Sequence, residues 1–130
     1  MEKKIVYIAI PFSHTSEAVE KERYDIVTKL AALMCKDGEI VFSPITHSYP
    51  LQQVSDLPNN WDYWGKHDRA FLEMSKKLVV VMAPGWEESE GVQAEIQIAK
   101  ELEIPTAYYS IEKQYKFSSE KDPAEEREER

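Results

Sequence analysis

The sequence is poor in cysteine, with Cys35 as the single thiol among 130 residues. One thiol excludes an internal disulfide and agrees with a reducing compartment. Because Cys35 follows Leu33 and Met34 on an expected helix, we interpret it as a packing residue and not as a nucleophile. No apolar run approaches the roughly 20 residues of a membrane-spanning helix, and no signal-peptide cleavage pattern follows the N-terminal apolar stretch. These absences favour a cytoplasmic protein with no membrane partner.

The sequence also lacks the patterns of several common ligand sites. It has four glycines and neither a Gly-x-Gly-x-x-Gly pattern nor the lysine of a P-loop, which disfavours a dinucleotide or nucleoside triphosphate bound in the usual way. His14, His47 and His67 have no metal-ligand spacing with one another or with the cysteine, so we predict no metal and no cofactor. A net charge of −8 disfavours a nucleic-acid partner, because such binding needs clustered basic residues.

What is present is an alternation of apolar, strand-like runs with amphipathic stretches of helical period. The expected strands cover residues 4–10, 39–44, 76–84 and 104–110, and the expected helices cover residues 16–35, 61–75 and 89–103. Continuous apolar runs such as IVYIAI are typical of parallel strands buried on both faces. We predict an α/β fold, a single three-layer Rossmann-like (flavodoxin-like) domain with a parallel sheet of four to five strands in the order 2-1-3-4.

Two segments fall outside this alternation. Residues 1–112 are assigned to the domain and residues 113–130 to a charged C-terminal tail, which from Glu120 onward has six acidic and three basic residues and almost nothing apolar to bury. Residues 45–60 are polar and contain Pro50 and Pro58. Because long connections in small domains usually carry function, we interpret this segment as a loop that covers a site.

Two acids occupy positions that their expected helices would bury. The neighbours three and four residues away are Gly91, Val92, Ile98 and Ala99 for Glu95, and Trp64, Gly65, Phe71 and Leu72 for Asp68. A carboxylate on a buried face is costly unless a site is arranged around it. Two interpretations are open. In the first, both acids belong to a site. In the second, the helix phase expected for one of them is wrong, or the acid pairs with Arg23 or His67.

The predicted strand order provides a place where both acids could act. In a 2-1-3-4 sheet the connections diverge between the first and third strands, and ligands bind there beyond the carboxyl ends of the strands. The loops leaving these strands are PFSHTS, which contains Pro11, Phe12 and Ser13, and PGWEES, which ends at Ser89. Ser89 is an expected N-cap, and the N–H groups of the following turn, including that of Gly91, would face an anion.

Three stretches together resemble the nucleoside 2-deoxyribosyltransferase superfamily, which also contains 2′-deoxynucleoside 5′-monophosphate N-hydrolases. They are YIAIPF near the N-terminus, Asp68 in the helix before LVVVM, and SEGVQAEI after that strand. The resemblance covers about residues 4 to 110 and is greatest to a bacterial and phage branch with a PGWEES-like loop. It implies an enzyme that cleaves the N-glycosidic bond of a 2′-deoxynucleoside or its 5′-monophosphate, by hydrolysis or by deoxyribosyl transfer to another base.

The resemblance also implies the roles of three catalytic residues. Glu95 matches the nucleophile that attacks the anomeric carbon, Asp68 the acid that helps to protonate the departing base, and Tyr7 the hydroxyl that orients the nucleophile. The chemistry suits these groups, because a carboxylate can trap an oxocarbenium-like state while a second acid protonates the leaving group. We expect a raised pKa for Asp68, and we expect Tyr7 to keep Glu95 ionised.

The matched position of Ser89 bears on the substrate. In the transferases the similar position holds an Asp that binds a sugar hydroxyl, and in the hydrolases it holds a Ser that binds phosphate. Because Ser does not repel phosphate, the sequence favours hydrolysis of a 5′-monophosphate. Trp61, Trp64 and Trp86 are interpreted as packing or subunit contacts, with a place over a bound base as the alternative for Trp86. His47 completes the expected substrate contacts. Relatives share sites between subunits, so the resemblance implies a homodimer or homotetramer.

A binding module is the competing hypothesis. A Rossmann-like sensor could hold a nucleotide at the same helix start without cleaving it, and would not need an inward pair of acids. A receiver domain fits less well, because it needs acids after the first strand, where this chain has Pro11 and Phe12.

Overall fold

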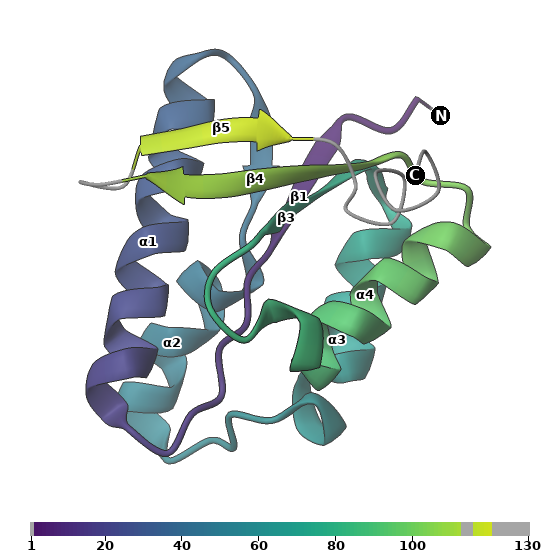
Figure 1. The fold of residues 1–130 in the computed structure, drawn as a ribbon. Helices are drawn as coiled ribbons and strands as arrows, with labels where there is room; N and C mark the ends of the chain where they lie inside the picture. Colours follow the sequence, from purple (N-terminus) through teal and green to yellow (C-terminus); the bar gives the residue numbers. More distant parts are fainter. Residues whose placement is uncertain (1, 113–115, 121–130) are drawn as a thin grey trace, which may run out of the picture.

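The structure, a computed structural model, describes residues 2–112 and 116–120 and is built on one sheet in the order β2-β1-β3-β4-β5 (Figure 1). The strands are β1 Ile5–Ala9, β2 Ile40–Phe42, β3 Ser75–Val81, β4 Thr106–Glu112 and β5 Lys116–Glu120. The first four are parallel and β5 runs antiparallel to β4. The predicted α/β fold with the parallel order 2-1-3-4 is therefore confirmed. Strand β5 was not predicted, and residues 113–115 and 121–130 of the expected tail lie outside the described residues.

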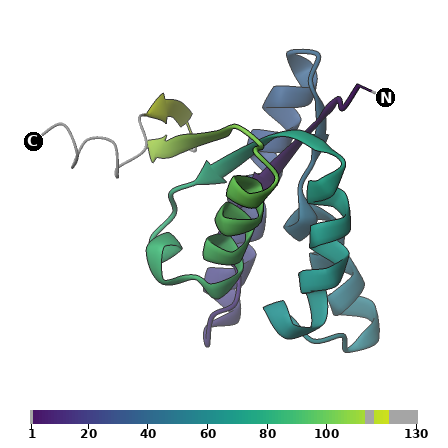
Figure 2. The ribbon, with the colours of Figure 1, turned by 90° about the vertical axis from the view of Figure 1, so that its right-hand side faces the viewer.

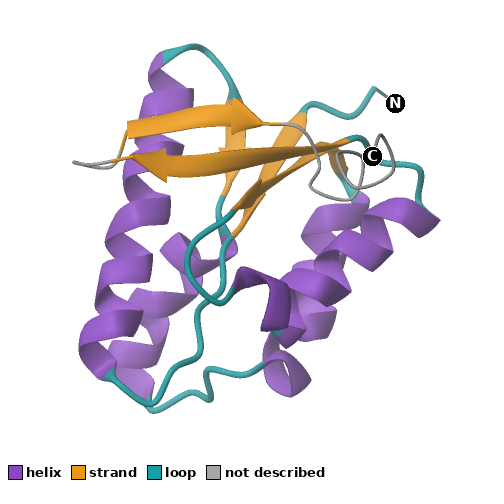
Figure 3. Ribbon diagram, in the orientation of Figure 1, coloured by secondary structure: helices purple, strands orange, loops and turns teal. Residues whose placement is uncertain are grey.

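Helices cover both faces of the sheet, which gives the predicted three layers. They are α1 Glu17–Lys36, α2 Pro44–Ser55, α3 Trp61–Glu73 and α4 Glu90–Glu101, with a short 3₁₀ helix at Trp86–Glu88. Helices α1 and α2 lie on one side of the sheet, and α3 and α4 lie next to each other on the other side (Figures 2 and 3). In the described part of the chain, none of the helices is both long and apolar enough to cross a membrane.

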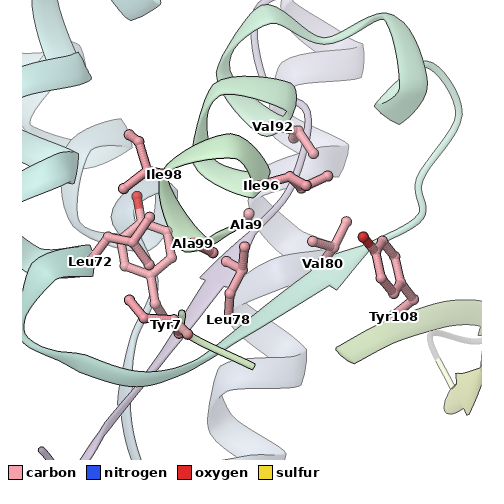
Figure 4. Close-up of a cluster of buried hydrophobic side chains, with 11 residues drawn as sticks. Tyr7, Ala9, Leu72, Leu78, Val80, Val92, Ile96, Ile98, Ala99 and Tyr108 are labelled. Atoms are coloured by element: carbon pink, nitrogen blue, oxygen red, sulfur yellow. The ribbon is translucent and has the colours of Figure 1, made fainter. Parts of the chain in front are cut away.

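The central strands are buried on both faces because their side chains alternate between two apolar clusters. Tyr7 of β1 and Leu78 of β3 belong to the cluster under α3 and α4, where Figure 4 shows the Tyr7 ring among the aliphatic side chains. Val6 and Ile8 point to the opposite face, against α1. This arrangement explains the continuous apolar run in the sequence and directs Tyr7 toward the helices that carry the two inward acids.

Residues 45–60 are mostly not a loop, and that prediction was wrong. Ser43 caps α2 by accepting a hydrogen bond from the Thr46 N–H at 3.3 Å, and Pro44 occupies the first turn, where its missing N–H costs nothing. Pro50 lies inside the helix. The Ser–Pro start thus outweighs the prolines and polar residues on which the loop prediction depended.

One further interpretation is also wrong. Cys35 is exposed near the end of α1 and does not pack into the core. The buried face of this helix is formed instead by Ile26, Val27 and Leu30.

Candidate active site

A cavity of about 380 Å³ lies at the carboxyl ends of β1 and β3. This is the point where the chain connections diverge, and the volume is in the range of small-molecule sites. Its walls come from the loop after β1, from α2, from the segment before α3, and from the start of α4. Although residues 44–55 form a helix, the segment does cover a cavity: Ile45, Ser48 and Gln52 of α2 line it.

Three elements bring the predicted catalytic residues to one point beside this cavity. Asp68 of α3 and Glu95 of α4 both line the cavity, with 7% and 5% of their surfaces exposed. Tyr7 is fully buried in β1, and its hydroxyl donates a hydrogen bond to Oε2 of Glu95. The inward orientation of both acids, which the helical spacing predicted, is confirmed.

Asp68 is buried with one oxygen unused. Its Oδ1 has no hydrogen-bond partner in the structure. Burial raises the pKa of this carboxyl from 3.8 to about 7, so a large fraction carries a proton at neutral pH. A buried polar atom without a partner is unusual in a folded protein, and a ligand in the cavity could supply the missing bond.

Glu95 is more strongly perturbed than Asp68. Its pKa is raised from 4.5 to about 8 as the net result of burial, which raises it most, of the hydrogen bond from Tyr7, which lowers it, and of the charge of Asp68, which raises it. The expectation that Tyr7 keeps Glu95 ionised at neutral pH is therefore wrong: the hydrogen bond acts in the expected direction, but burial outweighs it. The pKa of Tyr7 itself is raised well above its ordinary value, chiefly by burial, so its hydroxyl stays a donor.

We expect the free energy of unfolding to fall as the pH rises from about 4 to about 8. Both carboxyls have raised pKa values in the folded state, so the unfolded chain loses these protons at lower pH than the folded chain does. The cost is absent below the unfolded pKa values and reaches on the order of 3 kcal/mol per group near neutral pH. Chemical denaturation at acid and mildly alkaline pH measures the change. A double variant, Asp68→Asn with Glu95→Gln, should lose most of it, and an unaltered pH dependence would contradict the raised pKa values.

Five of the expected substrate contacts lie in the wall of the cavity. They are Pro11, Phe12, Ser13, Ser89 and Gly91. Ser89 caps α4 as predicted, because its hydroxyl accepts a hydrogen bond from the Val92 N–H at 3.2 Å. The first turn of α4 thus presents its N–H groups and its partial positive charge to the cavity.

The other two expected contacts lie elsewhere. His47 is exposed on α2, with its ring stacked at 5.6 Å from the ring of His67. Trp86 lies in the 3₁₀ helix, where its ring is 5.9 Å from that of Tyr108. Neither side chain lines the cavity.

Arg23 of α1 is a cavity residue that sequence reasoning missed. Its guanidinium donates to the carbonyls of Phe12 at 3.1 Å and Ser13 at 3.3 Å, and to that of Pro84 at 3.0 Å. It therefore joins the loop after β1 to the loop after β3. Burial lowers its pKa, but the group remains a cation at neutral pH. Among the described residues that line the cavity, Arg23 is the one basic side chain.

A second set of bonds closes the cavity wall. Glu20 of α1 accepts from the His14 N–H at 3.0 Å and from the Asn59 side-chain amide at 2.6 Å. The Ser13 hydroxyl donates to the Asn59 carbonyl. These bonds tie the loop after β1 to the segment that leads into α3.

In the part of the chain described, no three His, Cys, Asp or Glu side chains gather as they would around a metal ion.

A comparison with protein families places this chain. Residues 4–111 match the model of a family described as a domain of unknown function, DUF1937. The comparison with curated proteins finds no match.

Proposed function

The chain belongs to the DUF1937 family, and from the geometry of its cavity we propose that it cleaves the N-glycosidic bond of a 2′-deoxynucleoside or its 5′-monophosphate. The observation that carries this proposal is that Asp68 and Glu95, from two different helices, line one cavity and that Tyr7 of β1 donates a hydrogen bond to Glu95. Two buried acids with raised pKa values at a cavity are typical of catalytic sites. The proposal also includes membership of the nucleoside 2-deoxyribosyltransferase superfamily, on the resemblance of the three motifs.

The proposed reaction proceeds in two steps. The Glu95 carboxylate attacks the anomeric carbon as the bond to the base breaks, and the Asp68 carboxyl gives its proton to the departing base. The product of this step is a sugar ester of Glu95. Water then attacks the same carbon, Asp68 takes its proton, and Glu95 leaves as a carboxylate. Another base in place of water would make the reaction a transfer.

The pKa values bear on which protonation state reacts. The reactive form has a proton on Asp68 and none on Glu95. The pKa of Glu95, about 8, is higher than that of Asp68, about 7, so when the pair holds one proton it is mainly on Glu95. Because the two groups interact, these values describe the pair. The reactive form is then a minority species. Tyr7 supports it, since the hydroxyl donates to Glu95 and stabilises its ionised form.

Charge around the cavity supports a 5′-monophosphate as the substrate. Arg23 is partly buried, and the start of α4 presents N–H groups beside Ser89. Glu88 and Glu90 also line the cavity and oppose an anion, but both are exposed, so water and salt screen them more than Arg23. The net effect favours a phosphate between Arg23 and Ser89.

Arg23→Gln is expected to raise KM for a deoxynucleoside 5′-monophosphate by about 10- to 100-fold, the usual worth of a charge-assisted hydrogen bond. KM for the matching deoxynucleoside should change little, because it carries no phosphate. Steady-state kinetics with both substrates measures the difference. Lys21→Gln on the same helix removes an equal charge at an exposed site that pairs with Asp25, and serves as the control. An equal loss for both substrates would show that Arg23 acts only through the loops it joins.

A chromatographic screen tests the reaction itself. Wild type and Glu95→Gln are incubated with the four deoxynucleosides and their 5′-monophosphates, with and without a free acceptor base. Free base released by the wild type alone supports a hydrolase that uses Glu95. A new nucleoside that forms only with the acceptor supports a transferase.

One observation favours a second candidate, a nucleotide sensor that does not cleave its ligand. A Glu95 that is mainly protonated at neutral pH suits a hydrogen-bond donor to a ligand better than a nucleophile. Tight binding of a nucleotide without any product in the screen would select this candidate.

A further inference from the structure

We propose that Trp61 is the platform on which the base of the substrate stacks, and that Gly65 makes room for its ring against the backbone of α3. This inference rests on the proposed function, because it assumes a ligand with a heterocyclic base. Three observations carry it: the glycine contacts of the ring, its place in the cavity wall, and its position relative to Asp68 on the same helix.

The indole of Trp61 lies so close to the backbone of α3 that a side chain at Gly65 would displace it. A Cβ atom added at Gly65 would lie 2.8 Å from Cε2 and 3.1 Å from Nε1 of the indole. A Cβ atom at Gly91, in α4, would lie 3.6 Å from Cε3. Gly65 lies in the middle of a helix, where glycine is unfavourable by roughly 0.5–1 kcal/mol relative to alanine. The close approach of Trp61 explains why a glycine occupies this position in the helix.

The same ring forms a wall between two hollows. Trp61 lines the cavity that holds Asp68 and Glu95, and it also lines an outer hollow between α3 and α4 beside Gln97 and Glu101. Trp61 is partly buried: part of it packs against the apolar cluster under α3 and α4, and the part that lines the cavity is supported by the backbone at Gly65. A flat, rigid, apolar surface of this kind is what base stacking requires.

The other tryptophan in the cavity wall is already engaged within the fold. Trp64 is 8% exposed and donates from Nε1 to the Pro58 carbonyl at 2.6 Å. Its ring also meets those of Tyr63 and His67 edge to face. In the described part of the chain, by contrast, no aromatic ring packs on Trp61. Trp61 is therefore the tryptophan with a surface left for a ligand.

The position of Trp61 on α3 matches the chemistry assigned to Asp68. Trp61, Gly65 and Asp68 are separated by four and seven residues, so they lie along one face of the helix. Because the indole lies over Gly65, it is only three residues from Asp68, about 4.5 Å along the helix axis, so a base stacked on it would lie next to the carboxyl. A base stacked on Trp61 would lie along the same helix face as the acid that protonates it on departure.

Binding measurements on the full-length protein test the platform. Calorimetry compares a deoxynucleoside 5′-monophosphate with 2-deoxyribose 5-phosphate, which has the sugar and phosphate but no base; the Glu95→Gln background is used if the wild type cleaves the nucleotide. Trp61→Ala should weaken binding of the nucleotide by about 5- to 150-fold, the worth of one stacked base, and leave binding of the sugar phosphate unchanged. Trp61→Phe should retain most of the affinity.

Gly65→Ala gives a second, independent variant, because the added Cβ displaces the ring without removing it. It should weaken nucleotide binding in the same selective way. Tyr63→Ala on the same helix is the control, since Tyr63 is 42% exposed and does not line the cavity. Thermal unfolding of each variant identifies any that fail to fold.

The outcomes separate this inference from the proposed function. If the wild type binds nucleotides without cleaving them and Trp61→Ala selectively loses that binding, the platform stands and the enzymatic proposal falls. If cleavage depends on Glu95 but Trp61→Ala binds the nucleotide as the wild type does, the reaction stands and the platform falls. Equal loss of nucleotide and sugar phosphate in Trp61→Ala also overturns the platform, as does a wild type that binds neither.

Discussion

Replacing Glu95 by Gln is expected to lower turnover by about 10³-fold or more while making the protein more stable. Turnover falls because an amide cannot form the sugar ester through which the proposed reaction passes. Gln has nearly the shape of Glu, and its amide oxygen can still accept the hydrogen bond from Tyr7. The site should therefore keep its geometry while losing its nucleophile.

Stability should rise because the variant removes a buried ionisable group. The folded chain holds Glu95 with a pKa of about 8, whereas the unfolded chain ionises it freely, which at neutral pH costs on the order of 3 kcal/mol. Removing this cost should raise the temperature of unfolding by on the order of 5 °C or more. Rate assays and calorimetry on the same samples measure both effects.

Glu101→Gln is the matched control, because Glu101 lies on the same helix and is exposed. It should change neither turnover nor stability. Retained turnover in Glu95→Gln would remove Glu95 from the nucleophile role. A lower temperature of unfolding in that variant would mean that Glu95 is ionised and stabilised in the folded protein.

The second large effect is expected for Asp68→Asn, which should lower kcat by about 10²- to 10⁴-fold, the usual contribution of a general acid. Wild-type activity requires Glu95, with a pKa of about 8, to be ionised and Asp68, with a pKa of about 7, to be protonated, so it should rise with pH up to about 7 and fall above about 8. The two opposing requirements give a bell-shaped profile with a maximum between these values. Asn carries no such proton, so the variant should keep the rise and lose the fall. The pH dependence of kcat/KM for both proteins measures this.

The leaving group provides an independent check on this role. A deoxynucleoside of 7-methylguanine already carries positive charge on its base, so departure of the base needs no proton. Asp68→Asn should therefore cost much less activity with that substrate. Glu73→Gln, an exposed acid on the same helix, is the control for both experiments. An equal loss with both leaving groups would indicate that Asp68 only positions the substrate.

The features that sequence reasoning recovered depend on local periodicity. An apolar run such as that around Tyr7 indicates a buried parallel strand, and the three- and four-residue neighbours of Asp68 and Glu95 define the face that each helix buries. The Ser89 cap is likewise a local signal. Because the two buried acids lie on the helices before and after β3, which pack on the same face of the sheet, their meeting at one cavity follows from the fold.

The features that sequence reasoning missed depend on contacts between distant segments or on competing energies. Arg23 reads as one more charge on the polar side of an amphipathic helix, and it gains its position only because three loop carbonyls converge on it. The pKa of Glu95 depends on the balance between burial and one hydrogen bond, which the helical phase does not determine. The His47 and Trp86 side chains lie outside the cavity wall, a matter of orientation that spacing alone does not fix.

The antiparallel strand β5 affects how far the chain can be truncated from its C-terminal side. It pairs with β4 from Tyr108 opposite Glu120 to Glu112 opposite Lys116, and Phe117 packs over the apolar cluster on the α1 face. A chain ended at residue 112 would leave β4 as an open edge of seven residues, whose free N–H and C=O groups form a template for pairing with other chains. The short segment after the expected domain end replaces this edge with the five-residue strand β5, and a shorter edge is a poorer template for aggregation.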